Sequence, residues 1–350
     1  MTRGVFRRKS SGVGRRRLMT AFGAFGVLSA AVVITLAWSL FAYFGPGPAA
    51  RQGTSTDVIL PSGSGLPGIA TSLRQAGVIR SDLFFMIAAK ATGAARELKA
   101  GEYDFASGAS MAKILAAIKN GDVVRHFVTI PEGATSQVVM DILARANFLV
   151  GEAPAPPEGA VLPETYEVRR GDDRAAVLER MMQARDRLLA SLWAHRRADL
   201  PYRTPDEAVI LASIVEKETA KPDERPRIAA VFINRLVARM PLASDPTVIY
   251  GLTGGRPLGH GLTHEETASP TPYNTYLIAG LPPTPIANPG RASLAAALDP
   301  PRTNELYFVA DGTGGHAFAA TFDAHETNVT KWRAIEKTRK CQTTARAAAC

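Results

Sequence analysis

The sequence predicts an α+β protein with an N-terminal transmembrane helix, a small α+β subdomain and a larger mixed α/β domain. Residues 18–44 carry no charged side chain, which is typical of a membrane-spanning helix. Short strand-like and helix-like segments then alternate over residues 57–150. Residues 151–166 are rich in proline and glycine and mark a boundary, so we expect a second domain over residues 151–337.

Residues 1–17 are expected to form a basic cytoplasmic tail. They hold seven of the 41 lysine and arginine residues, and the first 44 residues hold no acidic residue. The 27 uncharged residues that follow exceed the ~20 needed to cross the hydrocarbon core. Basic residues favour the cytoplasmic side, so we expect one pass of the inner membrane, with the folded part outside, in the periplasm. A cleaved signal peptide also has this order of segments, but the length of the apolar run and the lack of a clear cleavage site favour an anchor.

The outer end of this helix is expected near Trp38, Tyr43 and Phe44, because aromatic side chains favour the membrane interface. Residues 45–56 contain the glycine, proline, serine and threonine of a flexible tether. In the small subdomain, the patterns predict strands at 57–60, 101–105 and 123–130, and helices at 65–77, 110–121 and 135–146.

The net charge of +9 raises the question of a nucleic-acid partner. Outside the basic tail, 34 basic residues nearly balance 32 acidic ones, so we expect no nucleic-acid partner. The two cysteines, Cys341 and Cys350, lie in an alanine-rich tail (338–350) that could hold a disulfide outside the cytoplasm, but to which we assign no role. His260 and His264 lie in a glycine-rich segment without a zinc motif, so we expect neither a metal nor a cofactor.

A helix that begins at Thr204-Pro205 carries the main catalytic candidate. Thr204 and Glu207 have the spacing of a capping box. An apolar stripe then continues into Glu218, which lies seven residues after Leu211. A carboxyl held against apolar neighbours has a raised pKa and can act as a general acid. The alternative is a structural Glu218, either paired with an arginine such as Arg235 or exposed on the last turn.

Several ordered motifs resemble the MltG family of YceG-like endolytic murein transglycosylases. They are ILASIVEKETA (210–220), IAAVFINRL (228–236), ASDPTVIYGL (243–252), SPTPYNTYLIAGLPPTPIANPG (269–290) and ELYFVADGTGGHAFAATFDAH (305–325). The resemblance covers about residues 57–335 and implies a membrane anchor, a LysM-like subdomain and a C-terminal catalytic domain. It also implies that the second glutamate of Glu-Lys-Glu, Glu218, is catalytic.

Other polar and aromatic residues of these motifs are expected to bind sugar rings. They are Ser213, Asn234, Asp245, Tyr250, Tyr273, Asn274 and Tyr276. Each also has a purely structural interpretation: Asp245 could be a helix N-cap, and Tyr250 and Tyr276 could be core aromatics.

The resemblance implies an endolytic lytic transglycosylase, a lyase that cleaves the bond between MurNAc and GlcNAc and leaves a 1,6-anhydro-MurNAc end. It also implies peptidoglycan glycan strands, the cytoplasmic membrane and cell-wall synthases such as penicillin-binding proteins as partners, and termination of nascent strands as the role. One alternative is a non-catalytic peptidoglycan-binding scaffold for cell-wall synthesis proteins. Another is a hydrolase whose second carboxylate is Asp245 or Glu164.

Overall fold

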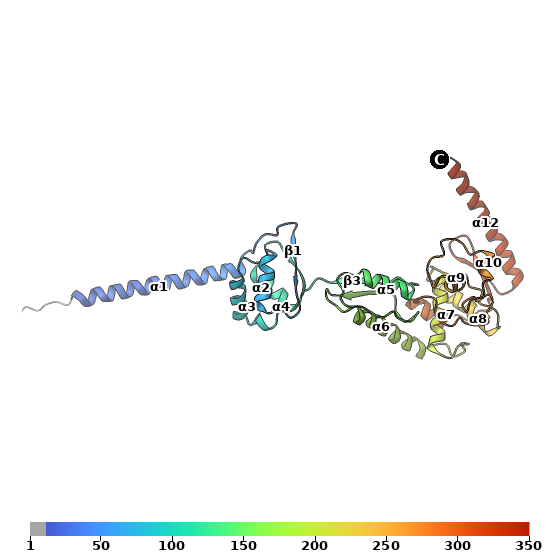
Figure 1. Ribbon diagram of the computed structural model, residues 1–350, viewed down its shortest axis with the longest axis horizontal. Coiled ribbons are helices and arrows are strands. Elements are labelled where there is room, and N and C mark those ends of the chain that lie inside the picture. Colours follow the sequence, from blue (N-terminus) through green and yellow to red (C-terminus); the bar gives the residue numbers. More distant parts are fainter. Residues whose placement is uncertain (1–11, 350) are drawn as a thin grey trace, which may run out of the picture. The chain divides into compact units, whose positions relative to one another are not determined.

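The computed structural model describes residues 12–349 and divides the chain into two compact units, Met1–Arg125 and His126–Cys350. Helices and two-stranded antiparallel sheets make up both units, which confirms the α+β class (Figure 1). Most of the basic tail, and any disulfide that involves Cys350, lie outside the described residues.

Helix α1 (Gly12–Phe44) is one uninterrupted helix at the start of the first unit (Figure 1). Its segment Gly26–Phe44 is apolar and long enough to cross a membrane, and none of it is buried inside the protein. These properties are consistent with a single-pass membrane anchor.

The rest of the first unit packs three α-helices and a short 3₁₀ helix against a two-stranded antiparallel sheet. Strand β1 (Ser55–Leu60) pairs antiparallel with β2 (Gly101–Ala106), so that Val58 lies opposite Tyr103. The helices are α2 (Leu66–Gln75), α3 (Asp82–Ala91), the short η1 (Ala94–Arg96) and α4 (Met111–Asn120). Two predicted strands and two predicted helices lie in this unit, and the predicted strand at 123–130 and helix at 135–146 are present in the second unit. Helix α3 was not predicted. Its sequence, DLFFMIAAKA, is apolar on most sides and therefore lacks the periodicity of an amphipathic helix.

Residues 45–56 do not form the flexible tether expected from their composition. The Gly47 amide donates to the Gly108 carbonyl (3.1 Å), and the Gly108 amide donates to the Pro48 carbonyl (2.9 Å). The Ala50 amide donates to the Ser107 hydroxyl (3.0 Å). The segment is thus fastened along the end of the β1-β2 sheet, because its backbone groups find partners there.

The second unit begins earlier than the predicted boundary at 150/151. Strand β3 (His126–Thr129) pairs antiparallel with β4 (Thr165–Val168), so strands on both sides of that boundary belong to one sheet. Helices α5 (Ser136–Arg145) and α6 (Arg174–Ala194) pack on this sheet around a core that includes Val139 and Met181. The proline-rich segment is therefore a long loop inside the unit rather than a linker between domains.

The remaining elements form a mainly helical core. They are α7 (Pro205–Glu218), α8 (Arg225–Val237), α9 (Asp245–Thr253), α10 (His264–Thr267), α11 (Arg291–Leu298), β5 (Tyr307–Ala310), β6 (His316–Ala319) and α12 (Phe322–Ala349). Helix α7 is buried along most of its length and packs against α8 and α11. Helix α12 continues through the alanine-rich segment that was expected to be a separate tail.

Candidate active site

Helix α7 ends at Glu218 and fixes the position of this carboxyl. The capping box of Thr204 and Glu207 is present at the start of the helix, as predicted. Leu211 and Ile214, on the stripe that leads to Glu218, are fully buried. The chain leaves the helix at Thr219 in an extended conformation, so Glu218 lies where α7 meets the loops.

The Glu218 carboxyl is partly buried, and its Oε1 accepts a hydrogen bond from the Ser244 hydroxyl at 2.5 Å. Burial, together with the nearby charge of Asp245, raises the pKa of Glu218, and the net value is about 7. The Ser244 hydrogen bond and the charges of His316 and Arg235 oppose this rise. Near neutral pH the carboxyl can therefore both give up and accept a proton, as a general acid and base must.

Ser244 is the residue that the sequence interpretation missed. It is the N-cap of α9, yet its side chain makes no capping bond and donates to Glu218 instead. Its backbone amide donates to the Thr275 hydroxyl (3.0 Å), which also bonds Thr247 (2.8 Å). The preceding Ala243 has a φ of 51°, a left-handed conformation that costs a residue with a side chain some free energy. The local backbone is thus held by its surroundings in the conformation that directs the Ser244 hydroxyl to Glu218.

Two of the predicted sugar-binding residues lie beside this carboxyl. The Tyr276 hydroxyl donates to Asp245 Oδ1 at 2.7 Å, and both side chains are exposed. Burial of its hydroxyl, together with the adjacent Asp245 and Glu218 charges, raises the pKa of Tyr276, so it stays a donor. Asp245 is the first residue of α9 rather than its N-cap.

Arg235 does not form the direct pair with Glu218 that the structural alternative proposed. Its Nε donates to the Leu306 carbonyl and its Nη1 to the Leu242 carbonyl, each at 2.7 Å. The guanidinium is therefore fixed by backbone groups, while its charge still acts on Glu218 and opposes the rise in its pKa.

His316 supplies a second basic group, at the start of β6. Its Nδ1 lies 2.7 Å from Glu224 Oε2, and its amide donates to Glu224 Oε1 at 3.0 Å. Burial works against ionisation of Glu224, but the hydrogen bonds and charge of His316 hold its pKa below the ordinary value. In the sequence, His316 stood out only as part of the motif at 305–325, with no role of its own.

Three predicted sugar-binding residues instead use their side chains for hydrogen bonds within the protein. The side chains of Ser213 and Asn274 are fully buried, and Asn234 is partly buried. Their partners are Ile210 O and Ile286 N for Ser213, Thr303 and Glu305 for Asn234, and Thr267 O, Ser269 O and Tyr276 N for Asn274. Because these side chains already have partners inside the protein, we expect them to hold the loops around the site in place rather than to bind sugars.

Tyr250 and Tyr273 form a separate cluster with Glu158. Their rings pack edge to face with centroids 4.9 Å apart. The Tyr250 hydroxyl donates to Glu158 Oε2 (3.2 Å), and the Tyr273 hydroxyl bonds Thr284 (2.8 Å). Burial raises the pKa of Glu158, although hydrogen bonds from Ser136 and Tyr250 oppose the rise.

Glu216, the first glutamate of Glu-Lys-Glu, points away from Glu218 into a buried ion pair. Its Oε1 lies 3.0 Å from Arg225 Nη2, and its Oε2 accepts the Gly290 amide at 2.8 Å. Arg225 also contacts Glu132 at 2.9 Å. The two glutamates of the motif therefore have different tasks, because two residues turn the helix by about 200°.

The YceG-like family model matches residues 58–331 of this chain. An endolytic murein transglycosylase of Bacillus subtilis (strain 168) is 30% identical over 306 residues, which cover 78% of this chain and 83% of the relative. An endolytic murein transglycosylase of Streptococcus pneumoniae serotype 2 is 28% identical, over 77% of this chain and 57% of the relative. A crystal structure of a yceG-like protein from Listeria monocytogenes has a TM-score of 0.50 at 26% identity, over 78% of this chain and 98% of that one. Because the family model spans most of its length, the chain belongs to the YceG-like family.

Proposed function

We propose that this protein is an endolytic murein transglycosylase and that Glu218 is its single catalytic acid and base. The observation that carries the proposal is one carboxyl at the end of a buried helix, with its pKa raised to about 7. Relatives named endolytic murein transglycosylase share 28–30% identity over more than three quarters of the chain, which supports the same activity.

In the proposed reaction, the Glu218 carboxylic acid gives its proton to the oxygen that links MurNAc C1 to GlcNAc. The bond from C1 to that oxygen breaks through an oxocarbenium-like state. The 6-hydroxyl oxygen of the same MurNAc then forms a bond to C1, and its proton returns to the Glu218 carboxylate. No water is consumed, so one carboxyl serves both steps and the product ends in a 1,6-anhydro ring.

The surrounding groups support these two protonation states. Ser244 donates to the carboxylate, and the charges of Arg235 and His316 stabilise it after the proton has left. Asp245 favours the protonated form. The exposed pair of Asp245 and Tyr276 presents a carboxylate and an aromatic ring, groups that suit a sugar's hydroxyls and its ring face.

We also propose a membrane topology and a cellular location for this protein. Helix α1 crosses the cytoplasmic membrane once, with the basic N-terminus inside and the catalytic unit in the periplasm. The enzyme then acts on nascent glycan strands near the cell-wall synthases at that membrane. The scaffold alternative would keep the same setting but leave the glycan intact.

Product analysis separates these activities. Purified peptidoglycan is incubated with the full-length protein, and the released fragments are identified by mass spectrometry. We expect internal cuts with 1,6-anhydro-MurNAc ends. New reducing ends would instead indicate a hydrolase that uses Asp245 or Glu164, and unchanged glycan would indicate the scaffold.

We expect kcat/KM to fall about tenfold per pH unit above pH ~7, because only the protonated Glu218 can begin the reaction. In Ser244→Ala the carboxylate loses a donor that lowers its pKa, so the decline should move to higher pH. The pH profile of anhydro-product release measures both effects. Ser191→Ala, at an exposed serine of α6, is the control, and a Ser244→Ala decline that moves to lower pH would contradict this role.

A further inference from the structure

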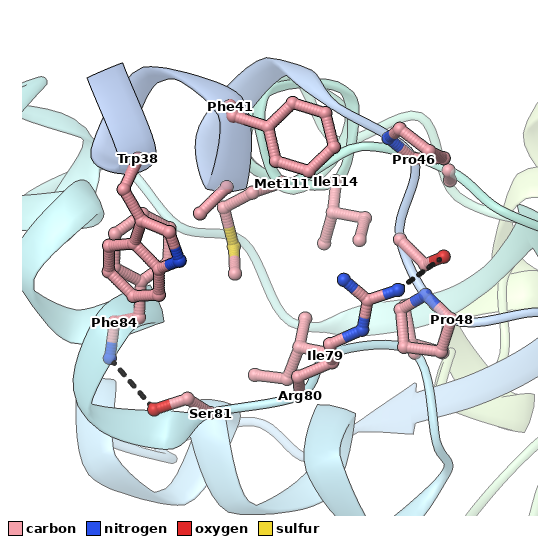
Figure 2. A pocket seen from close by; sticks show the side chains of 14 residues that line it. Trp38, Phe41, Pro46, Pro48, Ile79, Arg80, Ser81, Phe84, Met111 and Ile114 are labelled. Atoms are coloured by element: carbon pink, nitrogen blue, oxygen red, sulfur yellow. Dashed lines mark hydrogen bonds between the residues drawn. The ribbon is translucent and has the colours of Figure 1, made fainter. Parts of the chain in front are cut away.

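Helix α3 is fastened to the end of α1 that leads into the folded part of the chain. The rings of Trp38 on α1 and Phe84 on α3 meet edge to face, with centroids 5.9 Å apart. Both side chains line a cavity of about 170 Å³, together with Phe41, Arg80 and Met111 (Figure 2). The depth of α3 in a membrane is therefore set by how far α1 is inserted.

The length of the apolar run fixes the depth of α3 in the bilayer. The 27 uncharged residues span about 40 Å, against about 30 Å of hydrocarbon, so about 10 Å of helix extends into the interface. Trp38 precedes the end of α1 at Phe44 by six residues, or about 9 Å. Trp38 is then placed in the interface, the layer that aromatic side chains favour. Helix α3 thus lies in the interfacial layer.

The outer face of α3 is apolar at this depth. Leu83 and Ile87, which lie four residues apart and share a face, are 63% and 54% exposed. The opposite face is buried in the subdomain through Phe85 and Ala89. An apolar face of this kind is stabilised when it enters the boundary between headgroups and acyl chains.

The adjoining cavity combines an apolar wall with one cationic group. Figure 2 shows the Arg80 guanidinium extending into the space between Phe41, Ile114 and Pro48. One of its nitrogens donates to the Gly47 carbonyl at 3.4 Å, and Arg80 remains exposed. A guanidinium pairs well with a phosphate, and the wall suits the first carbons of an acyl chain.

We propose that the outer face of α3 and this cavity form a phospholipid-binding surface. Leu83 and Ile87 enter the outer leaflet, and the cavity takes one phospholipid whose phosphate meets Arg80. This inference rests on the proposed membrane anchoring. It makes the subdomain a lipid-bound base for the catalytic unit rather than the end of a loose tether.

The test uses the full-length protein in phospholipid nanodiscs, with Cys341→Ser and Cys350→Ser to remove the native thiols. An environment-sensitive fluorophore is attached at Leu83→Cys or, as the matched control, at Ile59→Cys on β1, where Ile59 is 53% exposed. Phospholipids with a nitroxide on the upper acyl chain should quench the Leu83 probe roughly twofold or more relative to the Ile59 probe, since interfacial helices lie ~5–10 Å deep. Equal quenching would overturn the placement of α3.

Native mass spectrometry of the protein released from the nanodiscs tests the cavity. Arg80→Glu should retain bound phospholipid at roughly tenfold lower occupancy than wild type, because a charge-assisted pair is lost. Arg96→Glu, at an exposed arginine of η1, should match wild type. Equal occupancy in the two variants overturns the role of Arg80. A wild-type chain that does not enter nanodiscs would instead refute the anchor.

Discussion

Glu218→Gln is expected to abolish the release of anhydro-muropeptides while the protein stays folded. The amide has nearly the shape of the carboxyl and can still accept the Ser244 hydroxyl, but it cannot supply or take up the proton. General acid–base catalysis contributes roughly 10²–10⁴-fold in rate, and here one group acts in both steps. The loss should therefore reach at least about 10³-fold in kcat, measured by mass spectrometry of timed digests.

The matched control is Glu152→Gln, at an exposed glutamate of the same unit. It should keep the wild-type rate. Thermal unfolding of both variants checks that the fold is unchanged. Glu218→Gln should not lower the stability, because it removes a carboxyl whose burial is unfavourable when it is charged. Anhydro-product release at the wild-type rate by Glu218→Gln would refute the proposed mechanism.

Features that depend on neighbouring residues could be predicted from the sequence. The apolar run of α1 and the capping box and stripe of α7 are local patterns, and the stripe leads into Glu218. The choice of Glu218 as the catalytic residue came from the family resemblance, because the stripe alone also fits a structural glutamate. The prediction of Asp245 and Tyr276 near Glu218 came from family motifs rather than from a local physical rule. Their mutual hydrogen bond joins residues 31 positions apart.

Features that depend on distant segments could not be predicted. Ser244 has the sequence position of an ordinary N-cap, and only the fold shows that its hydroxyl is directed to Glu218. His316 follows a glycine-rich turn, and its partner Glu224 lies 92 positions away. Ser213 and Asn274 are the types of residue that bind sugars, yet burial gives them internal partners. Composition alone also made residues 45–56 look like a tether, because it does not show where the backbone amides find acceptors.

Arg225→Met is expected to destabilise the protein by about 3–5 kcal/mol, because it leaves the buried Glu216 carboxylate without its cation. Arg225 and Glu216 are 6% and 8% exposed, and their side chains meet at 3.0 Å. The Gly290 amide, at 2.8 Å, would remain as a partner of the carboxylate but carries no full charge. Thermal unfolding of the full-length protein in detergent should show a fall in Tm of roughly 10 °C.

Arg227→Met, on the same helix, is the control for Arg225→Met. It also removes the arginine of an ion pair, but this arginine is more exposed, so the comparison shows how much of the loss in stability is due to burial. Arg227 pairs with Glu305 through its Nε and Nη2 nitrogens in three hydrogen bonds. Its own side chain is 49% exposed and that of Glu305 14%, so its removal should cost less than that of the buried Arg225, about 1 kcal/mol. The double variant Arg225→Met/Glu216→Leu removes the uncompensated charge and should recover part of the loss, although the Gly290 amide then lacks its acceptor. If Arg225→Met and Arg227→Met unfold at the same temperature, the buried pair does not stabilise the end of α7, and the position of Glu218 must depend on the apolar packing of the helix instead.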